Sequence, residues 1–254
     1  MKVTLLQTDI RWCEAEHNRA EAERMMNEAG TTDLFVLPEM FPTGFCLTPA
    51  EIAEEADGPT LTWMKCQATQ RQCAIAGSVA VKEGERFFNR LYFVCPDGEV
   101  FHYDKRHTFT YGGESATYTA GHQRVVVHYQ GFRILLLVCY DLRFPVWSRN
   151  RADYDAVIYV ANWPTSRIRV WDTLLRARAL ENQCYVIAVN RVGSDPACPY
   201  CGHSAVVDAY SKDRLLLTDE AQSASCNLEM DSLQAFRQKF AVLRDADEFS
   251  LDAE

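Results

Sequence analysis

ILLLV (residues 134–138), AVIYVA (156–161) and YVIAV (185–189) are three short runs made only of apolar residues. Strands that are covered on both faces have this pattern, whereas a strand with one face in water alternates apolar and polar residues. The segment Arg167–Asn182, between the second and third runs, is rich in Leu, Ala, Arg and Glu and has the amphipathic pattern of a helix. These runs therefore predict buried strands with helices packed outside them.

The rest of the chain continues the alternation of strands and helices. Pro96-Asp97-Gly98 and Gln130-Gly131 are turn sequences that predict two hairpins, so the sheets cannot be purely parallel. We expect an α/β fold with mixed sheets, and a single domain over residues 1–254, because no repeat or linker interrupts the pattern. Further strands are expected at Val3–Gln7, Leu34–Leu37, Ala74–Val81, Phe87–Cys95, Glu99–Tyr103, Val125–Tyr129, Val206–Ala209, Leu215–Thr218 and Ser223–Met230, and further helices at Glu14–Ala29, Leu61–Gln72 and Ser232–Phe240.

Composition and charge limit the class of protein. Of 254 residues, 48% are hydrophobic and 24% charged, as in ordinary globular proteins. With 26 Lys+Arg against 35 Asp+Glu, the net charge of −9 argues against general nucleic-acid binding, which requires a basic face. The longest apolar run, Ile134–Tyr140, has seven residues, far fewer than the roughly 20 that span a membrane.

The ten cysteines bear on the compartment. The segment MKVTLLQTDIRW reaches the charged Asp9 too early for a secretory signal, so we expect a cytoplasmic protein. Disulfides are rare in that compartment, and several cysteines, such as Cys95 and Cys184, lie in apolar runs where a thiol acts as a small hydrophobic side chain. Free thiols are therefore expected, of which one or two are reactive.

Three polar residues stand at the ends of predicted strands, where α/β proteins bind their ligands. Glu39 follows Leu34–Leu37, Lys105 follows the second strand of the first hairpin, and Cys139 ends the run 134–138. A thiol attacks a carbonyl as its thiolate, which a nearby cation stabilises and which forms when a carboxylate takes the proton. The same cation and a backbone N–H can then hold the oxyanion. The three residue types thus fit an acyl-transfer site.

Each residue also has an ordinary structural interpretation. A cysteine in an apolar strand is usually a core residue, and a glutamate or lysine after a strand is usually solvated. A non-catalytic binding protein on this fold remains an alternative, because fold alone does not determine function.

Longer segments around these residues resemble the signature blocks of the nitrilase superfamily of carbon–nitrogen hydrolases. The segments are LFVLPEMFPTGF (34–45), YDKRHTF (103–109) and LLVCYDLRFPVWSRN (136–150). The resemblance implies that Glu39 is the general base, Lys105 the cation at the oxyanion and Cys139 the nucleophile. It also implies a second glutamate, Glu114 in GGESATYTAG (112–121), which positions Lys105. The family further implies a four-layer α-β-β-α sandwich with two mixed sheets, no cofactor or metal, and a homodimer.

Finer motifs are similar to the bacterial omega-amidase branch of that superfamily. They include KRHTF followed by GGE, then CYDLRFPVW, VANWP and ARALENQCYVIAVNRVG. The implied reaction is hydrolysis of the terminal amide of dicarboxylate monoamides such as 2-oxoglutaramate, through a thioester on Cys139, with release of ammonia. The alternative is another amidase or carbamoyl hydrolase of the same superfamily with a different carboxamide.

A substrate with a distal carboxylate needs a cation, and arginine suits a carboxylate through its two-pronged geometry. Arg143 is the first candidate and Arg167 the second. The alternative for both is a salt bridge that braces a loop. The aromatic side chains expected to wall the pocket are Phe45, Tyr111, Tyr140 and Trp163.

The segment SDPACPYCGHS (194–204) departs from the family pattern. Cys198 and Cys201 have the spacing of a redox pair, but that motif normally opens a helix near the start of a redox fold. A zinc site would need two further ligands, of which only His203 is a candidate. We therefore expect a solvent-facing loop with two free thiols that alters the mouth of the pocket. A Cys–His protease would need a histidine beside Cys139, and His107 is the nearest to the site in sequence.

Overall fold

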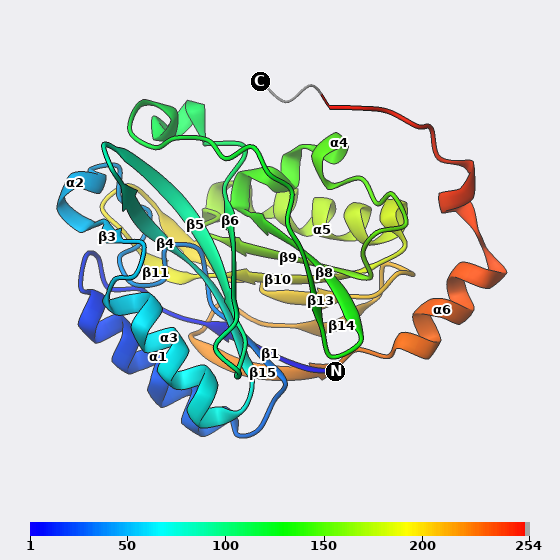
Figure 1. Cartoon of the computed structure of the whole chain (residues 1–254), viewed down its shortest axis with the longest axis horizontal. Helices are drawn as coiled ribbons and strands as arrows, with labels where there is room; N and C mark the ends of the chain where they lie inside the picture. The colour runs from blue at the N-terminus through cyan, green and yellow to red at the C-terminus, as the bar shows by residue number, and fades with distance from the viewer. Residues whose placement is uncertain (252–254) are drawn as a thin grey trace.

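The three apolar runs form neighbouring parallel strands in the computed structural model, which describes residues 1–251 (Figure 1). Ile158 on the middle strand is in register with Leu136 on one side and Ile187 on the other. The sheet has the order β14-β13-β10-β9-β8-β7, and its outer pairs are antiparallel. Its strands are β7 (Val126–Tyr129), β8 (Phe132–Val138), β9 (Ala156–Ala161), β10 (Tyr185–Asn190), β13 (Ala205–Val207) and β14 (Asp213–Leu216).

The second sheet has the order β15-β1-β2-β4-β5-β6, with β3 beside β4. Strand β1 pairs in parallel with β2 and antiparallel with β15, so this sheet is mixed as well. Its strands are β1 (Lys2–Gln7), β2 (Leu34–Val36), β3 (Glu54–Glu55), β4 (Ala74–Glu83), β5 (Arg86–Val94), β6 (Val100–Asp104) and β15 (Gln222–Asn227).

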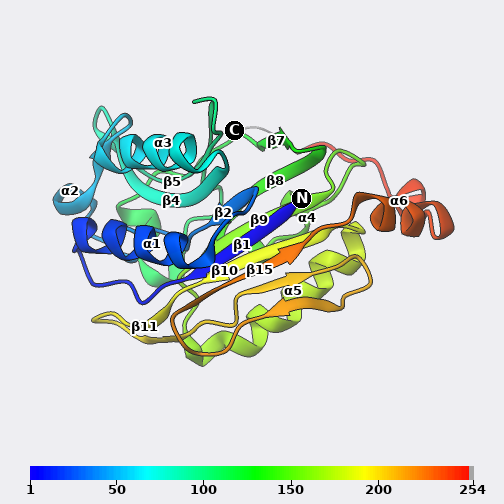
Figure 2. The same cartoon turned by 90° about the horizontal axis from the view of Figure 1, so that it is seen from below.

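The two sheets pack face to face and helices cover their outer faces (Figure 2). One apolar cluster joins Leu5 and Phe93 of the second sheet to Leu136 of the first, and it extends to Trp171 on α5 (Ile168–Asn182). On the other side, α1 (Ala15–Ala29) and α3 (Pro59–Arg71) pack against the second sheet through Met26 and Met64. The layers therefore run α-β-β-α, and the expected four-layer sandwich is confirmed.

The shorter elements lie around this sandwich. They are the helices α2 (Pro49–Ile52), α4 (Pro145–Ser148) and α6 (Met230–Lys239), the small hairpin of β11 (Val192–Ser194) and β12 (Pro199–Cys201), and the 3₁₀ turns η1 (Thr110–Gly112), η2 (Glu114–Ala116), η3 (Cys139–Arg143), η4 (Thr165–Arg167) and η5 (Val242–Asp245). Within residues 1–251, no helix combines the length and apolar character that crossing a membrane requires.

Several predicted boundaries differ by one or two residues, such as those of β13 and β14, and the end of the last strand differs most. The strand expected over Ser223–Met230 stops at Asn227, and Met230 begins α6. The partner strand explains the early end, because Asn227 pairs with Lys2, the first residue of β1. Just past this pair, Leu228 N–H donates to the Met1 carbonyl at 2.9 Å and the Met1 amino group donates to the Leu228 carbonyl at 3.1 Å, and the chain then turns into the helix.

Candidate active site

The ends of three strands bring the residues expected to be catalytic together. Glu39 lies just beyond β2, Lys105 follows β6, and Cys139 follows β8. The first two come from one sheet and the third from the other, so the packing of the sheets decides whether they meet. Gly121 helps to place the lysine, because its N–H donates to the carbonyl of Lys105 at 2.9 Å. A Cβ on Gly121 would lie 2.1 Å from the carbonyl oxygen of Asp104, so only glycine fits there.

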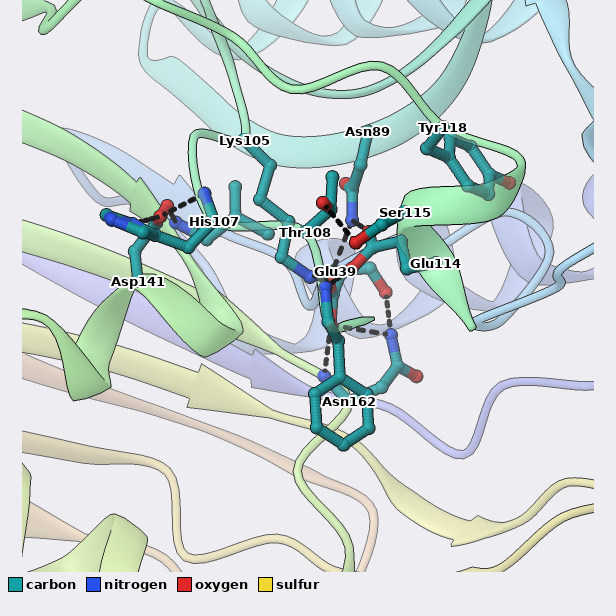
Figure 3. Close-up of polar contacts among 12 residues, drawn as sticks. Glu39, Asn89, Lys105, His107, Thr108, Glu114, Ser115, Tyr118, Asp141 and Asn162 are labelled. Atoms are coloured by element: carbon teal, nitrogen blue, oxygen red, sulfur yellow. Dashed lines mark hydrogen bonds and ion pairs between the residues drawn. The ribbon is translucent and has the colours of Figure 1, made fainter. Parts of the chain in front are cut away.

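Lys105 is buried between two glutamates (Figure 3). Its Nζ donates to Glu39 Oε1 at 2.9 Å and to Glu114 Oε2 at 2.8 Å. Both carboxylates are fully buried, and Glu114 also accepts the backbone N–H of Phe109 at 2.6 Å. An ammonium group has three N–H donors. Two are used here, which leaves the third for a ligand.

The charges of this group shift its proton affinities. Burial opposes the charge of Lys105, but Glu114 and Glu39 together outweigh it and hold the lysine pKa well above its usual value. Burial raises the pKa of Glu114, and the neighbouring charge of Glu39 adds to this effect while Lys105 opposes it. Lys105 is therefore firmly protonated, and it neutralises one of the two buried carboxylates.

Cys139 begins η3 directly after β8, in a constrained backbone conformation. Its φ of 44° lies in the left-handed region, which is uncommon for a residue with a side chain and is often found at functional sites. Its side chain is partly exposed at the wall of a cavity. Surrounding protein atoms raise the pKa of the thiol well above its usual value, Glu39 adds to the shift, and Lys105 opposes it. The resting thiol is therefore protonated and lies beside a carboxylate that can accept its proton.

Asp141 fastens the loop after Lys105 to the turn that carries Cys139. It is fully buried, and its Oδ2 accepts Val138 N–H at 3.0 Å and the hydroxyl of Tyr103 at 2.8 Å. Its Oδ1 accepts the backbone N–H of His107 at 3.0 Å and lies 2.7 Å from His107 Nδ1. The imidazole thus pairs with Asp141, as Figure 3 shows, and the Cys–His protease alternative gains no support.

A cavity of about 280 Å³ lies over Cys139. Its volume suits a small molecule. Of the site residues expected from the sequence, Glu114 alone is missing from its lining, because that glutamate lies behind Lys105. The expected residues that line the cavity are Glu39, Phe45, Lys105, Tyr111, Cys139, Tyr140, Arg143, Trp163 and Arg167.

Two guanidinium groups enter this cavity, each resting on an aromatic ring. Arg143 lies over Trp163 at 5.0 Å from the ring centroid, and Arg167 lies over Phe109 at 5.2 Å. In residues 1–251, neither guanidinium forms an ion pair with a carboxylate. The described residues therefore do not show the alternative, a salt bridge that braces a loop, and both arginines are available to an anionic ligand.

The expectation for Ser194–Ser204 was partly wrong. The segment is not simply a solvent-facing loop, because β11 and β12 pair within it and Tyr200 is buried under the guanidinium of Arg191 at 4.6 Å. Asp195 stabilises the turn by accepting the N–H groups of Ala197 and Cys198. Asp195, Ala197, Cys198 and Tyr200 line the cavity, so the segment shapes the pocket as expected.

The two thiols of this segment are free and partly buried, and His203 pairs with Asp172 at 3.1 Å. The motif therefore contributes to the wall of the pocket, and neither the redox nor the zinc interpretation gains support from these contacts.

Sequence reasoning missed three residues that hold the site together. Asn162 donates its backbone N–H to Glu39 Oε2 at 2.8 Å and its side-chain amide to the carbonyl of Glu39 at 2.6 Å. It follows β9 directly, so the rule that favours polar residues at strand ends could have found it. Asp141 lies in the quoted CYDLRF motif without a role assigned to it, and Asn89 lies inside β5, where no local signal marks it.

We predict that Asp141→Asn destabilises the protein by about 2–4 kcal/mol, because an amide NH₂ would face donors that now bind a carboxylate. Denaturant unfolding measures the effect. Asp153→Asn is the matched control, since it removes a partly exposed carboxylate paired with Arg124 and is expected to cost about 1 kcal/mol or less. Equal unfolding midpoints for the two variants would contradict the role given to Asp141.

Comparison with known proteins agrees with this site. The family model "Carbon-nitrogen hydrolase" matches residues 2–221. The chain is 44% identical over 255 residues to omega-amidase YafV of Escherichia coli K12, covering 99% of this chain and 98% of that protein. It is 35% identical over 216 residues to 2-oxoglutaramate amidase of Bacillus subtilis, covering 83% of each.

The fold agrees with that of a solved relative. XC1258 of Xanthomonas campestris, a CN-hydrolase superfamily protein with an arsenic adduct in its active site, is 40% identical and superposes with a TM-score of 0.97 over 99% of both chains. This chain therefore belongs to the carbon–nitrogen hydrolase family, the nitrilase superfamily.

Proposed function

We propose that this hydrolase is an omega-amidase, which cleaves the terminal amide of dicarboxylate monoamides such as 2-oxoglutaramate and releases ammonia. The observation that carries the proposal is the pair Arg143 and Arg167, which have no carboxylate partner among residues 1–251 and lie in the same cavity as Cys139. Relatives named omega-amidase and 2-oxoglutaramate amidase, at 44% and 35% identity, support it.

The first half of the reaction forms a thioester. Glu39 takes the proton of Cys139 as the sulfur bonds to the amide carbon, and the C=O electrons move onto oxygen. The third N–H of Lys105 and the backbone N–H of Tyr140 stabilise this oxyanion. Glu39 then gives its proton to the nitrogen, the C–N bond breaks, and ammonia leaves.

Water completes the cycle. Glu39 takes a proton from a water molecule whose oxygen attacks the thioester carbon, and the C–S bond breaks when the second tetrahedral intermediate collapses. The sulfur recovers a proton from Glu39, and the dicarboxylate leaves. Glu114 keeps Lys105 in place throughout. The cycle uses only substrate, water and these side chains.

The surroundings of the thiol explain why a paired base is needed. With its pKa raised by burial and by Glu39, Cys139 is not a standing thiolate near neutral pH. Proton transfer must therefore accompany attack, and a carboxylate in the same buried group can accept the proton at once. The neutral resting thiol also limits reaction with other electrophiles.

The distal carboxylate of the substrate binds Arg143 in this proposal, with Arg167 as the second cation. Both guanidinium groups rest on aromatic rings, so no ion pair within the described part of the chain has to break when substrate binds. The aromatic side chains of Phe45, Tyr111 and Tyr140 line the path for the carbon chain.

We further propose one hydrolase domain over the whole chain, working in the cytoplasm as a homodimer. The family match over residues 2–221 supports the single domain, and ten free cysteines support a reducing compartment. Val146 on α4 is 52% exposed beside Trp147, which favours contact with a second copy. Light scattering should give twice the mass of the chain, and the mass of one chain would refute the dimer.

We predict that Cys139→Ala lowers ammonia release from 2-oxoglutaramate by at least about 1,000-fold, because the variant lacks the thiol that forms the acyl intermediate. Intact-protein mass spectrometry of the wild type should show a transient acyl adduct that the variant lacks. Cys66→Ala, which removes an exposed thiol on α3, is the control and should keep full activity. Normal ammonia release by Cys139→Ala would end the proposal.

We predict that Arg143→Gln raises KM for 2-oxoglutaramate roughly 10- to 100-fold with little change in kcat, because the lost charge lies away from the reacting carbon. Butyramide, which has no carboxylate, should be hydrolysed as by the wild type. Arg169→Gln changes an exposed arginine on α5 and controls for loss of charge. If Arg143→Gln still prefers 2-oxoglutaramate over butyramide as strongly as the wild type does, Arg143 does not bind the carboxylate.

A further inference from the structure

Asn89 makes a second bridge between the two glutamates that share Lys105. It lies on β5 and is 1% exposed. Its Nδ2 donates to Glu39 Oε1 at 2.8 Å and to Glu114 Oε1 at 3.1 Å (Figure 3). The two carboxylates, the ammonium group and the amide therefore form a closed, buried ring of hydrogen bonds beside the cavity.

The neighbours of Asn89 fix which end of its amide faces the glutamates. The hydroxyl of Ser78 on β4 accepts the backbone N–H of Met40 at 2.8 Å, so its own hydrogen is free to point elsewhere. It donates to Asn89 Oδ1 at 2.9 Å. Because the oxygen is held by Ser78, the NH₂ group must face the carboxylates, and both of its hydrogens are used.

Charge explains why an amide belongs at this position. Two buried carboxylates repel each other, and one lysine neutralises only one of them. A second cation would compete for the same oxygens, and an acid would add to the repulsion. The amide instead supplies two N–H donors to the ionised carboxylates without changing the charge of the site. Its contact with Glu39 also limits the directions in which that carboxylate can move.

We propose, resting on the function proposed above, that Asn89 is a positioning residue that holds Glu39 and Glu114 in fixed relation, so that Glu39 faces the thiol of Cys139 while Glu114 stays on Lys105. The titratable groups around this pair are Lys105 after β6, Cys139 on η3 and the hydroxyl of Tyr118, which follows η2. Asn162, which follows β9, adds neutral donors to Glu39. Asn89 is thus the only side chain among residues 1–251 that donates to both glutamates without charge.

The test measures how fast iodoacetamide alkylates Cys139 at each pH, with the modified peptide identified by mass spectrometry. This readout needs no amide substrate. In Asn89→Asp and Asn89→Leu the carboxylates lose two N–H donors, so protonated forms persist to higher pH. The acid limb of the profile, which is the pH range over which alkylation slows as the pH falls, should move to higher pH by about one unit or more.

Steady-state kinetics with 2-oxoglutaramate give a second readout. We expect kcat to fall roughly 10- to 100-fold in the Asn89 variants while KM changes by less than about threefold, because the carboxylate-binding arginines are untouched. Ser78→Ala frees the amide to turn but keeps it, so its shift should have the same direction and a smaller size. If both Asn89 variants fail to fold, Ser78→Ala alone tests the proposal. A wild-type pH dependence of Cys139 alkylation in Ser78→Ala would then overturn the role of Asn89.

Tyr92→Phe is the matched control for disturbance of β5. The Tyr92 hydroxyl donates to the carbonyl of Ala56 at 2.9 Å. The ring belongs to the apolar cluster with Met26 of α1 and Met64 of α3, on the face of β5 opposite to Asn89. Tyr92→Phe should lower thermal stability and leave the acid limb in place. Folded Asn89 variants with the wild-type profile would overturn the role of Asn89. Absence of ammonia release by the wild type would refute the omega-amidase function and leave the alkylation result interpretable.

Discussion

Lys105 Nζ, within 3 Å of a carboxylate oxygen of both Glu39 and Glu114, is the interaction on which the site depends. Burial and the neighbouring charge of Glu39 raise the pKa of Glu114, and the ammonium group opposes this shift. The lysine in turn stays charged only because two carboxylates surround it. The charges therefore depend on one another, and removing the lysine would leave two buried carboxylates without a cation.

Such a group needs a rigid frame. Its members come from loops after different strands, and small shifts between the loops would separate charges that must stay within hydrogen-bond distance. The apolar core between the two sheets supplies the frame at large scale. Locally, Gly121 holds the lysine loop, Asp141 ties that loop to the cysteine turn, and Asn162 ties Glu39 to the end of β9. Most contacts around the site serve to keep these loops in register.

The groups that cleave the amide and the groups that bind the distal carboxylate lie in different parts of the cavity. At its base, the charged groups are buried and paired with one another, and one N–H of Lys105 is left for the substrate. Nearer its wall, the two arginines rest on Trp163 and Phe109 and are only half-buried. They can bind an anion without first losing a protein partner, which keeps the cost of binding small. This division fits an enzyme that recognises one end of a molecule and cleaves the other.

The sequence by itself determined the features that depend on nearest neighbours along the chain. Apolar runs such as 134–138 specify buried strands, turn residues such as Pro96-Asp97-Gly98 specify hairpins, and polar residues after strands mark Glu39, Lys105 and Cys139. Tertiary structure alone decided the rest. Asn162 donates to Glu39 from 123 positions along the chain, and Asn89 lies in the middle of β5 without a local signal. Strand β15 ends at Asn227, which pairs with Lys2, the first residue of β1. These features depend on partners brought together only by the packing of the two sheets, and no local pattern encodes such partners.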